Sequence, residues 1–145
     1  MTRCMACDVL AGSIEAPGGV IHETRHWTVD HAVPRWIRGW LIVKPKRHVE
    51  HLAELSPEEA AELGPLVRAT SAAVARILEP QRVYVLSLGE EVHHIHLHVI
   101  PRYRELPPEV LTLLSAAWAA ERSPWECSEA EAARTAAALR EVLRA

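Results

Sequence analysis

The sequence predicts an α+β fold, in which one long helix packs on a mainly antiparallel sheet and a helical tail ends the chain. Three observations support this prediction. Short β-type stretches at residues 18–24, 26–31 and 40–45 precede a long helical pattern. Two adjacent β-type stretches, residues 82–88 and 94–100, follow that pattern. The rest of the chain is rich in alanine and favours helix. This order of elements is typical of an α+β domain.

Each predicted strand has its own signal. The first two are short and are flanked by turn residues. Residues 40–45, WLIVKP, form an apolar run that Pro45 stops, which indicates a buried strand. Residues 82–88 alternate and are rich in β-formers. Residues 94–100 alternate histidine with apolar residues, and we expect Pro101 to close this strand.

The long helix has a clear start and a clear end. Ser56 is predicted as the N-cap, Pro57 takes the first helical position, and Glu59 completes a capping box. Pro80 ends the helix. Between these residues, apolar side chains recur at helical spacing: Leu63, Leu66, Val67, Val74, Ile77 and Leu78.

Both ends of the chain are also predicted to be helical. Residues 4–14 suit a short helical turn, and residues 107–121 and 128–143 suit two longer helices. Glu129 near the start of the last helix and Arg140 near its end match the helix dipole.

Length and composition limit the possible functions. The 145 residues suit one domain, and a hydrophobic share of 49% suffices for a core. The formal net charge of -3 argues against nucleic acid as a partner, because nucleic-acid-binding domains usually carry a basic surface. No stretch approaches the roughly 18 apolar residues of a membrane span, and the first residues lack the apolar core of a secretory signal. With three cysteines a disulfide scaffold is not expected, so we predict a protein of the reducing cytoplasm.

The strongest chemical signal is the run HHIHLHVIPR at residues 93–102. Side chains alternate along a strand, so His94, His96 and His98 are expected on one face, about 6.6 Å apart. Three imidazoles on one face must be solvated, hydrogen-bonded or bound to a ligand. The residues alone leave three interpretations open: a wet face that is rich in histidine, a metal site, or a neutral imidazole that attacks phosphorus.

Three segments, in this order along the chain, carry a resemblance to a known family. Residues 4–12, CMACDVLAG, residues 39–48, GWLIVKPKRH, and residues 94–100, HIHLHVI, resemble the motifs of the histidine triad superfamily. Pro101 and Arg102 follow the last motif, as in the bacterial and fragile-histidine-triad-like branch of that family.

The resemblance implies an organisation for the whole chain. Residues 1–103 would form a histidine-triad-like domain, and residues 104–145 a helical extension packed on the same domain. It also implies a homodimer, in which Trp118 and Trp125 of the extension would cover the partner subunit. The expected ligand is a nucleotide substrate, an adenosine derivative, with no nucleic acid and no membrane as partner.

The same resemblance implies roles for single residues. His96 would attack the α-phosphorus of a dinucleoside polyphosphate or a nucleoside phosphoramidate and form a covalent nucleotidyl-histidine. His98 would bind phosphate oxygens and stabilise the charge that develops on them, and His94 would orient the site. Asp30 would contact the ribose. Arg102 would reach phosphate, with a solvated loop charge as the equal alternative.

Three residues depart from the family pattern. Trp40 stands where the family has a histidine, and we expect it to pack in the core or to stack on a base. Glu90 and Glu91 stand where the family has an amide and a hydroxyl, and an ionised carboxylate cannot donate a hydrogen bond. Glu90 would face the substrate, and Glu90 or Glu91 would raise the pKa of a nearby histidine or bind a cationic leaving group. These departures favour an alternative function, a zinc-stabilised nucleotide-binding module with little turnover.

A metal site is also expected. Cys4 and Cys7 have the spacing of a zinc half-site. The resemblance implies His48 and His94 as the other two ligands, with His51 as the rival of His48. The prediction is therefore a structural zinc ion held by two cysteines and two histidines. A hydrolase that uses the histidine face itself as a catalytic metal site is a third interpretation.

A small basic cluster surrounds Pro45. Lys44, Lys46 and Arg47 are expected to lie on a solvated turn, and phosphate capture is the alternative.

Overall fold

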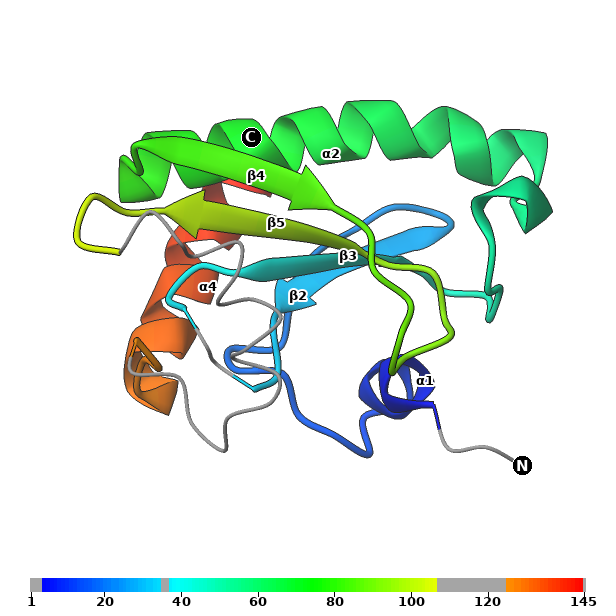
Figure 1. Ribbon diagram of the computed structural model, residues 1–145, viewed down its shortest axis with the longest axis horizontal. Coiled ribbons are helices and arrows are strands. Elements are labelled where there is room, and N and C mark those ends of the chain that lie inside the picture. The colour runs from blue at the N-terminus through cyan, green and yellow to red at the C-terminus, as the bar shows by residue number, and fades with distance from the viewer. Residues whose placement is uncertain (1–3, 35–36, 107–124, 145) are drawn as a thin grey trace.

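The computed structural model describes residues 4–34, 37–106 and 125–144. Within them the chain forms a five-stranded antiparallel sheet in the order β1-β2-β3-β5-β4, which confirms the α+β prediction (Figure 1). The strands are β1 (Val20–Glu23), β2 (Trp27–His31), β3 (Leu41–Pro45), β4 (Arg82–Leu86) and β5 (Leu97–Arg102).

Helices cover one face of this sheet. The long helix α2 (Pro57–Leu78) and the C-terminal helix α4 (Glu129–Arg144) pack on each other and on the strands. The short helix α1 (Met5–Leu10) lies away from α2, next to the connection between β4 and β5 (Figure 1). A 3-10 turn, η1 (Leu52–Glu54), leads into α2. The helix predicted at 107–121 lies outside the described residues. None of the helices in the described parts is both long and apolar enough to cross a bilayer.

The alternation of side chains along the strands separates a core face from a second face. The core face is apolar and packs against α2 and α4; it includes Trp27, Val29, Leu41, Val43 and Val99. The indole nitrogen of Trp27 donates to the carbonyl of Glu59 on α2 at 2.9 Å, which anchors the helix on the sheet. The pairing of β2 with β3 and of β3 with β5 brings polar side chains together on the second face.

The start of α2 is as predicted. Ser56 Oγ accepts from the Glu59 amide at 3.1 Å, and the Glu59 carboxylate accepts from the Ser56 amide at 2.8 Å, so the capping box is complete. Arg47 also donates to this carboxylate, and these contacts lower the pKa of Glu59 to about 2.

The strand that carries the histidines differs from the prediction at both ends. It begins at Leu97 rather than His94, and it continues through Pro101 to Arg102. Pro101 is tolerated because β3 pairs with β5 only as far as Val99, so the side of the strand beyond that point needs no amide donor. His94 and His96 therefore lie in the connection that enters the strand; His96 still faces the same side as His98, whereas His94 does not.

Candidate functional site

The three histidines of the triad take two different positions. His96 and His98 line a cavity of about 380 Å³, with ring centroids 4.8 Å apart and planes at 71°. His94 is fully buried, and its ring turns toward Cys4 and Cys7. The expectation that all three share one face is therefore wrong for His94, which precedes the regular strand and lies beside the cysteines.

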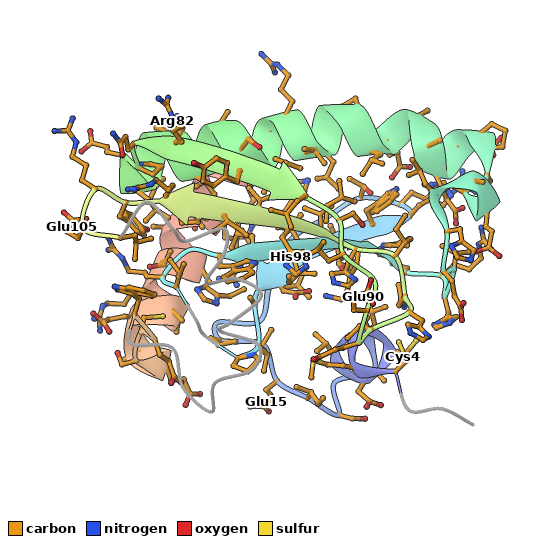
Figure 2. All side chains as sticks on the ribbon, in the orientation of Figure 1. Cys4, Glu15, Arg82, Glu90, His98 and Glu105 are labelled. Carbon is orange, nitrogen blue, oxygen red and sulfur yellow. The ribbon has the colours of Figure 1, made fainter. Side chains whose placement is uncertain are left out.

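The cavity lies between the second face of the sheet, α1 and the connection after β4. Figure 2 labels His98 on the sheet, and Glu90 and Cys4 near α1. Its walls are largely apolar and include Met5, Ala6, Val9, Val33 and Pro34. Its floor is polar and comes from Asp30, Lys44, His96 and His98. Such a mixture suits a ligand with one apolar part and one polar part.

The hydrogen bond of His96 determines which ring nitrogen carries the proton. Its Nδ1 lies 2.7 Å from the carbonyl oxygen of His94, and a carbonyl can only accept, so Nδ1 is the protonated nitrogen. Burial lowers the pKa of His96, although this hydrogen bond opposes the effect. The ring is therefore neutral at neutral pH and keeps a lone pair on Nε2.

The contact with Trp40 determines which ring nitrogen of His98 carries the proton. The Trp40 indole nitrogen donates to Nδ1 of His98 at 3.0 Å. An indole N–H is only a donor, so Nδ1 accepts and the neutral ring carries its proton on Nε2. Burial, followed by the neighbouring His96, lowers the pKa of His98 to about 4. Of the two expectations for Trp40, packing is the one observed, since its ring is buried beside Ile37 and Ile100.

The backbone around Trp40 is tied to β2. The Ala32 amide donates to the Trp40 carbonyl at 2.8 Å, and the Gly39 amide donates to Nε2 of the buried His31 at 3.0 Å. Gly39 has a φ of +80°, and a Cβ there would lie 2.2 Å from Leu78 Cδ1. Only glycine fits this position, which brings the indole to His98.

Lys44 is not on a solvated turn, so that expectation is wrong for this residue. Its side chain is 2% exposed and forms an ion pair with Asp30 on the neighbouring strand. Lys44 is still in β3 and faces the cavity, whereas Lys46 and Arg47 follow the strand and pair with Glu23 and Glu59. Burial raises the pKa of Asp30, and Lys44 partly offsets this effect.

The remaining predicted substrate residues divide between the cavity and the far end of the sheet. Glu90 and Glu91 are exposed and line the cavity at its rim. Arg102 is at the opposite end of β5, where it pairs with Arg82 of β4 and donates to the carbonyl of Tyr103. Figure 2 shows Arg82 far from Glu90. Arg102 is not among the described residues that line the cavity.

A second cluster brings together Cys4, Cys7, His48 and His94 from three parts of the chain. Their ligand atoms all lie within 4.8 Å of one another. Cys7 Sγ is 3.3 Å from His48 Nδ1 and 3.5 Å from His94 Nδ1, and Cys4 Sγ is 3.8 Å from His94 Nδ1. Tetrahedral zinc with Zn–S of about 2.3 Å and Zn–N of about 2.0 Å separates its ligands by roughly 3.3–3.8 Å. The donor set therefore fits a metal ion.

The surroundings of this cluster also suit a cation. Nε2 of His94 donates to the Pro45 carbonyl at 2.9 Å, which leaves the lone pair of Nδ1 directed at the cysteines. Burial, together with the Cys4 thiol, raises the pKa of Cys7 to about 11, and a bound cation would offset this cost by stabilising the thiolate. His51, the rival of His48, is exposed and lies at the start of η1.

The sequence predicts Lys44 on a turn, with phosphate capture as the alternative, and it does not predict that α1 forms a wall of the cavity. Lys44 shares a face with Ile42 by strand alternation, and this parity was the available signal. Nothing in the sequence indicated that α1 would form a wall, because its position depends on the contact of Cys4 and Cys7 with distant histidines.

Relatives of known sequence share most of the chain. Residues 14–105 match the family model described as the HIT domain. The protein hit of Bacillus subtilis is 30% identical over 106 residues, which cover 70% of this chain and 72% of that protein. The adenosine 5'-monophosphoramidase hnt1 of Schizosaccharomyces pombe is 29% identical over 107 residues, which cover 70% of this chain and 76% of that protein.

Solved structures share the fold. A hypothetical histidine triad nucleotide-binding protein of Sulfolobus tokodaii has a TM-score of 0.75 at 18% identity and covers 97% of this chain, which covers 92% of it. A Zn-bound histidine triad family protein of Mycobacterium smegmatis has a TM-score of 0.70 at 20% identity, with coverages of 97% and 93%. The match to the HIT domain and the similarity to the Bacillus subtilis protein identify the family. The chain belongs to the HIT, or histidine triad, family.

Proposed function

We propose that the chain is a nucleotidyl hydrolase or transferase in which His96 attacks the α-phosphorus of a nucleotide derivative. One observation carries the proposal: Nδ1 of His96 donates to the His94 carbonyl while the ring lines the cavity. The other nitrogen, Nε2, then has a lone pair for a ligand in the cavity. A neutral imidazole of this kind is a nucleophile toward phosphorus.

The reaction is a displacement in two steps. Nε2 of His96 forms a bond to the α-phosphorus while the bond from phosphorus to the leaving oxygen or nitrogen breaks. The leaving group keeps the electron pair and takes up a proton from solvent. Water then attacks the same phosphorus and loses a proton to solvent, the bond to Nε2 breaks with its electron pair returning to the ring, and the nucleoside monophosphate leaves with His96 again neutral.

His98 acts on the phosphate rather than as a second nucleophile. Trp40 occupies Nδ1 of His98, so the neutral ring is a donor through Nε2. A donor aimed at a non-bridging oxygen stabilises the charge that develops as the nucleophile adds. His94 acts as a positioning residue, because its carbonyl holds the ring of His96.

The two ends of the cavity suit the two ends of a nucleoside. Asp30 pairs with Lys44 through Oδ2, so Oδ1 remains to accept from a ribose hydroxyl. The apolar walls from α1 and residues 33–34 suit a purine base. The fission yeast relative is named an adenosine 5'-monophosphoramidase, and this name supports an adenosine derivative as the first substrate to test.

We further propose that zinc occupies the cysteine and histidine cluster. Two thiols, two imidazoles and their separations support zinc, and a Zn-bound protein shares the fold. Four protein ligands leave no open position, so zinc would have a structural role. This argues against the hydrolase with a catalytic metal, since His96 and His98 lie outside the cluster.

Nucleotide binding with little turnover is the second candidate, and the carboxylates of Glu90 and Glu91 favour it. Both are exposed at the rim of the cavity that holds His96. Their charge repels an anionic leaving group such as a polyphosphate, so a substrate with an uncharged or cationic leaving group would react better.

The test compares the wild type with His96→Ala and His93→Ala on adenosine 5'-phosphoramidate and a diadenosine polyphosphate. His93 is exposed and is not among the described lining residues, so it is the matched control. We expect turnover by the wild type and His93→Ala, and a loss of about 1,000-fold in His96→Ala. Equal turnover by all three proteins would rule out His96 as the nucleophile. Tight binding of AMP by a wild type that never turns over substrate would favour the second candidate.

A homodimer is proposed as the working state. β4 is the last strand of the sheet and pairs with β5 alone among the described strands. Its residue Val85 is 43% exposed. An exposed edge strand with an apolar side chain is a surface on which a second copy can add.

A further inference from the structure

Lys44 places a positive charge in the cavity. The two-step reaction by His96 and His98 assigns no role to this charge. Its side chain is 2% exposed, and it lines the cavity together with His96 and His98. A lysine is almost never buried to this degree unless a partner compensates its charge. Asp30 is that partner, which leaves open what the other N–H groups of the ammonium bind.

The strand register places Lys44 beside the proposed nucleophile. Ile42 pairs with His98, and Val43 pairs with Leu97. Continuing this register by one residue sets Lys44 opposite His96. Residues opposite each other in an antiparallel pair have Cβ atoms about 4.5–5.5 Å apart and point to the same side.

The ammonium group reaches from that position toward the next row of the sheet. Asp30 pairs with Ile42 and therefore lies in the row of His98, and Lys44 bonds to its carboxylate. The ammonium is therefore directed toward β2, at the level of the row of His98, and it lines the cavity that also contains His96 and His98.

The ammonium group of Lys44 has more N–H donors than acceptors around it, which indicates that it binds a ligand. It has three N–H groups, and Asp30 accepts from it. Within residues 4–34, 37–106 and 125–144, the ammonium has Asp30 as its hydrogen-bond partner and no second one. Buried N–H groups of a cation are costly when unpaired, so an oxygen atom of the ligand is the expected second partner.

We propose that Lys44 is a substrate-binding residue that donates to a non-bridging oxygen of the α-phosphate. Asp30 compensates the buried charge of the ammonium, and the contact with phosphate uses the N–H groups that Asp30 leaves available. The proposal rests on the proposed function, because it takes the ligand to be a nucleotide. During attack by His96 the cation would stabilise the charge on the phosphoryl oxygens from one side, and His98 would do so from another.

The contribution of the phosphate to binding separates this role from ribose binding. We would measure the Kd of AMP and of adenosine by calorimetry, and divide the adenosine value by the AMP value. For Lys44→Met we expect this ratio to fall by about 10-fold or more, because hydrogen bonds to charged groups are the strong ones. For Asp30→Asn, which keeps the ammonium, we expect the ratio to be unchanged or larger.

A double variant guards against misfolding. Lys44→Met leaves a buried carboxylate without its partner, and this can destabilise the fold. Asp30→Asn with Lys44→Met removes both charges, and its ratio should fall about 10-fold or more below that of Asp30→Asn alone. Thermal unfolding and zinc content verify that each variant is folded.

The outcomes separate the two proposals. An unchanged ratio in both variants that lack Lys44, or equal losses for AMP and adenosine, would overturn the phosphate contact. A wild type that binds neither ligand would overturn it as well. A wild type that binds AMP but has no turnover would contradict the hydrolase proposal alone, and the ratio would still decide the role of Lys44.

Discussion

Trp40 sets the protonation pattern of His98, although it stands where the family pattern has a histidine. An imidazole at position 40 could donate or accept, whereas an indole N–H can only donate. Trp40 donates to Nδ1 of His98, so the neutral ring carries its proton on Nε2. Nε2 is then a donor for a phosphate oxygen. The departure from the family pattern is therefore compatible with catalysis.

Replacing Trp40 with phenylalanine tests this role. Trp40→Phe keeps a buried ring but loses the N–H, so both neutral forms of His98 become accessible. We expect kcat to fall roughly 10- to 100-fold with a smaller change in KM, as for the loss of a transition-state donor. Nitrogen NMR of the His98 ring should show the proton moving from Nε2 toward a mixture. An unchanged ring spectrum would contradict the assigned role, whereas Trp40→His should regain part of the rate.

The lowered pKa of His98 makes stability depend on pH in a stated direction. Its folded value of about 4 lies below the ordinary value of 6.5, so the unfolded chain takes up this proton first. The stabilising effect is complete above pH 6.5 and is lost as pH falls toward 4. Within that window one such group lowers the free energy of unfolding by about 1.4 kcal/mol per pH unit.

The measurement compares wild type with His98→Gln in urea unfolding between pH 4 and 7. Both proteins keep the metal cluster, so its own pH dependence cancels in the difference. We expect the wild type to lose stability more steeply than the variant as pH falls. Parallel curves would show that His98 is not the group responsible.

At the scale of secondary elements, the cluster of cysteines and histidines connects α1 to the sheet, and the proposed zinc ion would fasten it there. Cys4 and Cys7 belong to the start of the chain, His48 follows β3, and His94 precedes β5. Helix α1 has six residues, which is too short to be stable alone. Since α1 supplies a wall of the cavity, a metal ion in the cluster would maintain the proposed binding site from outside the cavity.

Removal of the metal should therefore loosen α1 and leave the sheet folded. After chelation we expect rapid hydrogen exchange over residues 4–12, slow exchange in β3 and β5, and weaker AMP binding. His48→Ala should have the same effect, and His51→Ala should not, which makes the two histidines a matched pair. Slow exchange at α1 after complete loss of metal would contradict this account.

At the scale of the whole molecule, the edge strand β4 predicts the oligomeric state. We expect light scattering to give a dimer for the wild type and a monomer, or a much weaker dimer, for Val85→Lys. A lysine on an edge strand opposes the addition of a second strand. A monomeric wild type at micromolar concentration would remove the homodimer proposal.

Patterns with a single local cause could be read from the sequence. The capping box of α2 depends on neighbouring residues, and the histidine motif identified the family. What could not be predicted depends on contacts between distant segments. Lys44 turned out buried because Asp30 faces it from β2, and His94 left the common face because the cysteines lie beside it. The division into residues 1–103 and 104–145 stays a prediction, although α4 packs on α2 and β1.

The carbonyl of His94 supports the ring of His96, while the imidazole of His94 faces the cysteines. His94 thus contacts the cysteine cluster through its side chain and the ring of His96 through its backbone. Mutagenesis that replaces His94 and finds an inactive enzyme would therefore say nothing about which of these two duties was lost. Only a protein altered at Cys4 or Cys7, with the motif itself intact, can separate them.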